Sequence, residues 1–282
     1  MSVTISPSPV REPARTKCVA VFDCSVPRAW RGIDLLIADS RALPLPLAAD
    51  VLDANEQSRL RRLHPRARVP FQRRRLLLRL LASAYTGSSV DEPFDGVPCT
   101  GCGVTHSAPR NRTMRRLGLQ SSTSNVGSAV AVAFGPAALG VDIEAIANVT
   151  PAALSLALTS AESASLSAMR AADRSREAAR YWTFKEATSK AAGVGNGVPL
   201  KSWRVELSND SDRVGIGGET GGDWSGVTVP VSDALVAAVV WPSEAVGNGQ
   251  MRMSTCSIRY KDIRVEVTHT AIGFGGQGES DE

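Results

Sequence analysis

Acidic and basic side chains recur at short, regular spacings in two stretches of the sequence. Asp142 and Glu144 lie two positions apart in LGVDIEAI, so on a β-strand both carboxylates would point to the same side of the sheet. Glu186 and Lys190 lie four positions apart in RYWTFKEATSKAAG, which on a helix puts them on one face. Three carboxylates and an ammonium group that meet at one point would suit a hard divalent cation and phosphate chemistry.

Simpler interpretations of these residues stay open. Alternate acids on a strand commonly line the solvent face of an antiparallel sheet. Glu186 and Lys190 could form only an ion pair within the helix, and Trp182, one turn earlier, would then serve core packing.

An arginine-rich run precedes both stretches. Nine arginines and no acidic residue lie between Arg59 and Arg79. The apolar pattern predicts a helix over about residues 68–85, on which Arg75 and Arg79 project together. Such a charge density without neutralising acids suits several phosphates. The alternative is a solvated face whose aliphatic stems cover apolar surface.

A third motif, CTGCGVTHSAP, carries Cys99, Cys102 and His106. The spacing makes them candidate ligands for zinc, although a closed structural site needs a fourth ligand that the sequence does not offer. A tight turn with incidental cysteines is the alternative.

Composition narrows the class of protein. The 282 residues carry a net charge of +4, which is too mild to indicate nucleic-acid binding by itself, and the arginine run lacks interleaved aromatics for base stacking. The N-terminus has no apolar signal-peptide core, and the longest apolar run, 126–141, is broken by Gly and Pro, so we expect no membrane span. Five cysteines without a leader favour a cytoplasmic protein.

Several local patterns predict secondary structure. Residues 44–62 indicate a helix, and Thr159 with Glu162 forms a capping box that would start another. Residues 128–134 and 139–144 flank Gly135-Pro136, which predicts a hairpin whose second arm carries Asp142 and Glu144. Further strands are expected at 18–23, 119–123, 203–207, 226–230, 234–241 and within 257–270. Without parallel βαβ periodicity, these elements predict an α+β fold with two related halves joined near residue 136.

The two acidic stretches together resemble the signature of the Sfp-like 4′-phosphopantetheinyl transferases, which runs loosely G-[IV]-D-[IV]-E and then [WF]-x-x-K-E-[AS]-x-x-K-x-x-G. Every fixed position is filled here by the same residue types: Gly140, Asp142, Glu144, Trp182, Lys185, Glu186, Ala187, Lys190 and Gly193. The arginine-rich helix and the cysteine motif also resemble segments of that family, and the likeness covers roughly residues 18–242.

The resemblance implies two similar α/β halves with the active site between them. It implies a Mg²⁺-dependent enzyme that moves the 4′-phosphopantetheine arm of coenzyme A onto a serine of an acyl, peptidyl or aryl carrier protein and releases adenosine 3′,5′-bisphosphate. Asp142, Glu144 and Glu186 would hold the Mg²⁺. Glu186 would also take the serine proton, and Lys190 would neutralise the departing bisphosphate. The carrier's pathway stays open among fatty acid, polyketide, nonribosomal peptide and siderophore synthesis.

The resemblance also implies which side chains meet the phosphates of coenzyme A: Arg75, Arg79, Ser122, Thr123, Lys185 and Lys190. Two positions depart from the family pattern. Thr123 replaces the histidine of S-H-S, and Ala108 replaces the basic residue of G-[KR]-P. Both losses would weaken coenzyme A binding, so a degenerate member that binds a carrier protein or a nucleotide without catalysis is the alternative function.

The expected organisation follows from these motifs. Residues 1–16 are expected to be disordered, 17–136 to form an N-terminal half that binds the phosphates of coenzyme A, and 137–242 to form a C-terminal half that holds Mg²⁺ and catalyses the transfer. Residues 243–282 would be an extra, partly loose segment. We expect a monomer that binds neither nucleic acid nor a membrane.

Overall fold

The computed structural model describes residues 32–98, 105–207, 213–218, 223–245, 251–259 and 264–272. The predicted disorder of residues 1–16, the strand predicted at 18–23, and the cysteine pair of the zinc hypothesis lie outside these ranges.

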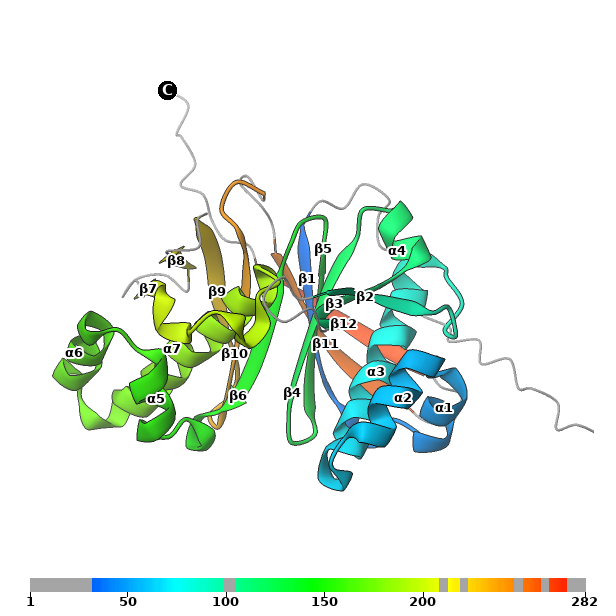
Figure 1. The fold of residues 1–282 in the computed structure, drawn as a ribbon, viewed down its shortest axis with the longest axis horizontal. Coiled ribbons are helices and arrows are strands. Elements are labelled where there is room, and N and C mark those ends of the chain that lie inside the picture. The colour runs from blue at the N-terminus through cyan, green and yellow to red at the C-terminus, as the bar shows by residue number, and fades with distance from the viewer. Residues whose placement is uncertain are drawn as a thin grey trace, which may run out of the picture.

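Two five-stranded sheets pack face to face, and helices cover their outer faces (Figure 1). The first sheet has the order β12-β11-β1-β5-β4: β12 (Arg264–Ile272), β11 (Met251–Arg259), β1 (Ile33–Asp39), β5 (Ala129–Gly135) and β4 (Gln120–Val126). The second has the order β6-β10-β9-β8-β7: β6 (Gly140–Ala145), β10 (Leu235–Pro242), β9 (Trp224–Ser232), β8 (Arg213–Gly218) and β7 (Trp203–Leu207).

The helices fall into two groups on opposite sides of the molecule (Figure 1). The first group lies beside the first sheet: α1 (Leu45–Val51), α2 (Ala54–Arg62), α3 (Pro65–Thr86) and α4 (Arg112–Arg116). The second lies beside the second sheet: α5 (Pro151–Ala157), α6 (Ser160–Ala168) and α7 (Ala171–Ala191). A short hairpin of β2 (Phe94–Pro98) and β3 (Thr105–Asn111) adjoins the first group. The predicted α+β class is confirmed, and in the described ranges no helix is long and apolar enough to cross a membrane.

The alternation of side chains along the central strands builds this layered core. In β5, Ala131 and Ala133 face the second sheet, whereas Val132 and Phe134 pack toward the first group of helices. In β10, Val239 lies in the core between the sheets, and its neighbours on the opposite face pack against α7. Small residues on the inner face of β5 let the sheets approach closely, while larger ones fill the space under the helices.

The predicted hairpin between 128–134 and 139–144 is wrong. β5 pairs with β1 on one edge and β4 on the other, while β6 pairs with β10 in the second sheet. Because both hydrogen-bonding edges of β5 are already filled, no edge is left for β6. The Gly135-Pro136 segment therefore carries the chain from one sheet to the other.

The end of the chain returns to the first sheet. β11 pairs in parallel with β1, with Met251 opposite Ile33, and β12 pairs antiparallel with β11. The described residues after 250 thus form a hairpin that extends the N-terminal sheet. The strand signal within 257–270 is confirmed. This pairing covers an edge of β1, which sequence periodicity cannot assign.

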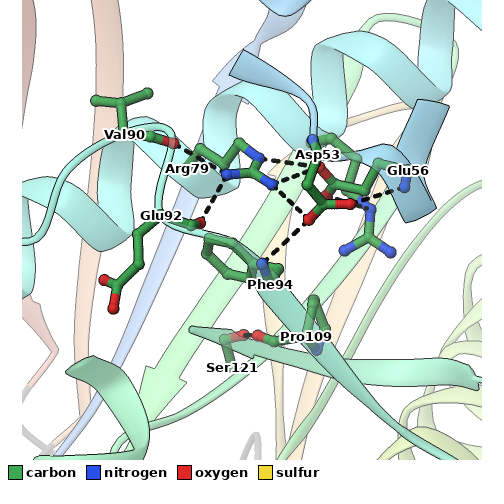
Figure 2. A network of polar contacts seen from close by, with 9 residues as sticks. Asp53, Glu56, Arg79, Val90, Glu92, Phe94, Pro109 and Ser121 are labelled. Atoms are coloured by element: carbon green, nitrogen blue, oxygen red, sulfur yellow. Dashed lines mark hydrogen bonds and ion pairs between the residues drawn. The ribbon is translucent and has the colours of Figure 1, made fainter. Parts of the chain in front are cut away.

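The helix predicted over 44–62 is interrupted. α1 ends at Val51 and α2 begins at Ala54, because Asp53 caps α2 in a capping box with Glu56. Figure 2 shows Arg79 of α3 held between these two acids. Its guanidinium donates to Asp53 Oδ2 at 2.8 Å, to Glu56 Oε2 at 2.6 Å and to the carbonyls of Val90 and Glu92. We call the fully buried Arg79 side chain together with Asp53 and Glu56 the arginine clip.

Arg79→Met is expected to lower the free energy of unfolding by about 3–5 kcal/mol, because it leaves two carboxylates buried beside an apolar side chain. Urea denaturation of the whole protein measures the loss. Arg66→Met is the matched control, since Arg66 lies exposed on the same helix and should cost less than about 0.5 kcal/mol. Equal losses in the two variants would contradict a structural role for the clip.

Candidate functional site

The site lies where the edge strands of the two sheets, β4 and β6, meet. Ser122 Oγ accepts a hydrogen bond from the backbone N–H of Val141 at 3.0 Å. Ser124 Oγ donates to Asp142 Oδ1 at 2.7 Å. Two alternate serines on β4 therefore tie the sheets together along a line that we call the seam (Ser122, Ser124, Val141 and Asp142).

Helix α7 lies directly over β6 because Gly140 has no side chain. A Cβ atom at Gly140 would lie 1.8 Å from the carbonyl oxygen of Ala187. Val141 and Ile143 point into the core between the sheets, so Asp142 and Glu144 point to the opposite face. The glycine thereby brings the two acids of β6 against the helix that carries Glu186 and Lys190.

Lys190 joins the seam. Its Nζ donates to Asp142 Oδ1 at 2.7 Å, to the carbonyl of Val141 at 3.0 Å and to Ser124 Oγ at 3.1 Å. The ion pair is partly shielded, with the Asp142 side chain 9% exposed. Lys190 thus forms its ion pair with Asp142 on β6. The alternative, an ion pair between Glu186 and Lys190 within the helix, does not hold.

Glu186 lies within electrostatic reach of the same acids. Burial raises the pKa of its carboxyl above the ordinary value, the charges of Asp142 and, more weakly, Glu144 raise that pKa further, and Lys190 lowers it. Glu144 Oε1 accepts hydrogen bonds from the N–H of Ala145 and from Asn148 Nδ2. Glu186 thus lies within electrostatic reach of two carboxylates and one ammonium, and a bound cation would offset the excess of negative charge.

The donor set fits a metal that is shared with a substrate. Among the residues that the structure describes, no three acidic, histidine or cysteine side chains already form a cation cage. Mg²⁺ prefers oxygen ligands, and it is usually held by one or two carboxylates together with water and substrate phosphate. Asp142, Glu144 and Glu186 supply such oxygens, so they suit Mg²⁺ in a substrate complex better than a closed structural site.

Lys185 does not face the seam, and its predicted contact with phosphate stays a prediction. Its fully buried Nζ donates to Glu162 Oε2 and to the carbonyl of Trp203, both at 2.6 Å. Burial lowers the pKa of Lys185, and the hydrogen bond to Glu162 opposes that shift. One residue before Glu186, Lys185 points about 100° away around the helix. Glu162 also closes the predicted capping box with Thr159, which is confirmed.

Two residues predicted to contact coenzyme A, Arg79 and Ser122, have polar groups that bond within the protein, and their contacts with coenzyme A stay predictions. Arg79 is enclosed in the arginine clip. Ser122 is 2% exposed and takes the N–H of Val141. Arg75 lies over the ring of Phe71, with its Nε 3.5 Å from Glu56 Oε1, so it is directed toward α2. Thr123 lies between the two seam serines in the sequence of β4, so its half-buried side chain points to the opposite face of the strand.

Sequence reasoning identified the arginine run but did not single out Arg73 and Arg74. Arg74 Nη1 donates to Asn125 Oδ1 at 3.0 Å, on the strand that carries Thr123. The buried Nε atoms of Arg73, Arg74 and Arg75 have no hydrogen-bond partner within the described ranges, although that of Arg75 lies 3.5 Å from Glu56 Oε1. Burial, with the charges of Arg75 and Arg59, lowers the pKa of Arg74 to about 10. An anion bound here would offset this concentration of positive charge.

Comparison with known proteins identifies the segment that carries the acids. Residues 138–240 match the family model of the 4′-phosphopantetheinyl transferase superfamily. The matched segment contains β6, α7 and most of β10, and therefore Asp142, Glu144, Glu186 and Lys190. No curated protein matches the chain.

Proposed function

We propose that this chain, whose residues 138–240 match the family model of the 4′-phosphopantetheinyl transferase superfamily, transfers the 4′-phosphopantetheine arm of coenzyme A to a serine of an apo carrier protein in a Mg²⁺-dependent reaction. Adenosine 3′,5′-bisphosphate is the second product. The observation that carries the proposal is the meeting of Asp142 and Lys190, at 2.7 Å, beside the half-buried Glu186.

Each side chain has a distinct role in the proposed reaction. The serine oxygen attacks the phosphorus that bears the pantetheine arm, and the bond from that phosphorus to the bridging oxygen breaks. Glu186 accepts the serine proton, and its raised pKa suits a general base. Lys190 donates to the oxygens of the departing bisphosphate. Asp142, Glu144 and Glu186 would hold Mg²⁺, which when bound offsets charge on the pyrophosphate.

For the phosphates of coenzyme A we infer a somewhat different set of basic residues from the one that the resemblance implied. Lys190, Thr123 and Arg75 remain candidates, and Arg73 and Arg74 are preferred to Arg79 because their Nε atoms lack partners in the described part of the chain. A basic helix face also suits carrier proteins of acidic character. A monomeric, cytoplasmic enzyme stays part of this proposal.

Mass spectrometry of carrier proteins tests the function. Purified protein, coenzyme A and Mg²⁺ are incubated with apo acyl, apo peptidyl and apo aryl carriers, and we expect the phosphopantetheine adduct on at least one of them. Removal of Mg²⁺ with EDTA should abolish the adduct. Absence of an adduct on every carrier would contradict the proposal.

A second candidate function, a binding module without catalysis, is favoured by one observation, the threonine at position 123 where the family pattern has histidine. Calorimetry separates the two functions. Carrier binding without any heat from coenzyme A would support the binding module, whereas saturable coenzyme A binding supports the transferase.

A further inference from the structure

We propose that the Lys190 ammonium is a place-holding cation on Asp142, so that a divalent cation binds in competition with it until a phosphate-bearing substrate accepts the ammonium. This inference rests on the proposed function, because it concerns how the same site takes up its metal. It makes metal binding and substrate binding depend on each other.

The Lys190 ammonium group has an acceptor within the protein for each of its donors. A lysine ammonium has three N–H donors, and Lys190 directs hydrogen bonds to three acceptors: Asp142 Oδ1, Ser124 Oγ and the carbonyl of Val141. These acceptors come from β4 in one sheet and β6 in the other, whereas Lys190 comes from α7. Lys190 therefore closes the seam from the side of α7.

The same contacts occupy Oδ1, one of the two carboxylate oxygens that Asp142 could offer a metal. Asp142 Oδ1 accepts from Ser124 Oγ at 2.7 Å and from Lys190 Nζ at 2.7 Å. A divalent cation that takes this oxygen must displace at least the lysine, because two positive groups cannot share it at close range without repulsion. Ser124 is a positioning residue in this arrangement, since it contacts both members of the pair.

A substrate that carries a pyrophosphate removes this competition. Its oxygens offer Lys190 charge-assisted hydrogen bonds in exchange for the one to Asp142. Asp142 Oδ1 is then free for the cation, and the phosphate supplies further metal ligands. Binding of the two ligands is therefore positively coupled, and typical couplings between sites are about 5–150-fold.

Equilibrium binding of Mn²⁺, followed by the electron paramagnetic resonance signal of the free ion, tests the inference on the whole protein. Without coenzyme A, we expect Lys190→Gln to bind Mn²⁺ at least about fivefold more tightly than the wild type. Ser124→Ala changes no charge. This variant should also bind Mn²⁺ more tightly, because Asp142 loses one hydrogen-bond donor and Lys190 loses one of its three acceptors. Lys201→Gln is the matched control, because Lys201 is exposed in the 3₁₀ turn Leu200–Ser202, and its affinity should equal that of the wild type.

Addition of coenzyme A completes the test, with Mn²⁺ bound by coenzyme A itself measured in protein-free solution. We expect coenzyme A to raise the Mn²⁺ affinity of the wild type at least about fivefold, and to raise that of Lys190→Gln much less. A Lys190→Gln variant that binds Mn²⁺ no more tightly than the wild type would overturn the inference. So would weaker binding by Ser124→Ala, since Ser124 would then prepare Asp142 for the metal.

Failure of the proposed function gives a different result. A wild-type protein that binds Mn²⁺ neither alone nor with coenzyme A would contradict both the metal site and the competition. Adduct formation on a carrier, together with equal Mn²⁺ affinities in all four proteins, would support the transferase and overturn only the role of Lys190. Thermal melting of each variant identifies any that do not fold, and Ser124→Ala remains decisive if Lys190→Gln is one of them.

Discussion

Glu186→Gln should lower the rate of phosphopantetheine transfer by at least about 10²-fold and at the same time stabilise the fold at neutral pH. The rate falls because an amide cannot accept the serine proton, and general bases contribute about 10²–10⁴-fold. The stability rises because partial burial, followed by the charges of Asp142 and Glu144, raises the pKa of Glu186 and so disfavours its ionised form in the folded protein. One substitution is thus expected to move activity and stability in opposite directions.

The pH dependence follows from the direction of that shift. The folded-state pKa of Glu186 lies above the ordinary value of 4.5, so its ionisation is harder in the folded than in the unfolded protein. The wild type loses stability relative to Glu186→Gln as the pH rises from the ordinary value through the folded-state pKa, and the difference is constant above it. Below both values the carboxyl is protonated in both states and the difference disappears.

Urea unfolding at pH 7 and at pH 4, with EDTA present, measures this difference, and carrier modification measures the rate. Glu177→Gln is the matched control on the same helix, where Glu177 pairs with Arg180 at 2.8 Å and no catalytic role is proposed. It should retain near wild-type transfer. A Glu186→Gln variant that transfers at the wild-type rate would remove Glu186 from the mechanism, and a stability gain that is equal at both pH values would refute the electrostatic cause.

Gly140→Ala is expected to destabilise the protein by about 3 kcal/mol or more, at or beyond the upper end of ordinary overpacking. The added methyl group would lie 1.8 Å from the carbonyl oxygen of Ala187 and 2.8 Å from the N–H nitrogen of Ala191. Both atoms belong to the backbone of α7, so no side chain can rotate out of the way. The helix must move off β6, which separates Glu186 and Lys190 from Asp142.

Thermal and urea unfolding measure the loss, and transfer should fall with it even where the variant remains folded. Gly127→Ala is the control, because Gly127 has a φ of +55° and nothing within 4 Å of its added Cβ. Its cost is limited to left-handed backbone strain, about 1–2 kcal/mol, and the seam should stay intact. A Gly140→Ala protein with wild-type stability and activity would contradict the close approach of α7 to β6.

The sequence by itself determined the chemistry of the candidate site. The spacing of two along β6 and of four along α7 specifies which side chains share a face, because strand and helix periods are local properties of the backbone. For the same reason, the capping box at Thr159 and Glu162 and the α+β class were predictable. For Gly140 the sequence showed only that it fills a motif position. Its physical role depends on the close approach of α7, which is a tertiary contact.

Tertiary structure alone decided which partners those side chains meet. Strand pairing is non-local, so the sequence did not reveal that β6 joins β10 or that the C-terminal hairpin returns to β1. Buried charges are likewise assigned by whichever opposite charges the fold brings within reach: Arg79 lies with Asp53 and Glu56, Lys185 with Glu162, and Lys190 with Asp142. Burying a charge unpaired costs several kcal/mol. Each lysine of α7 therefore pairs with the acid that the fold brings to it, Lys185 in the core and Lys190 at the seam.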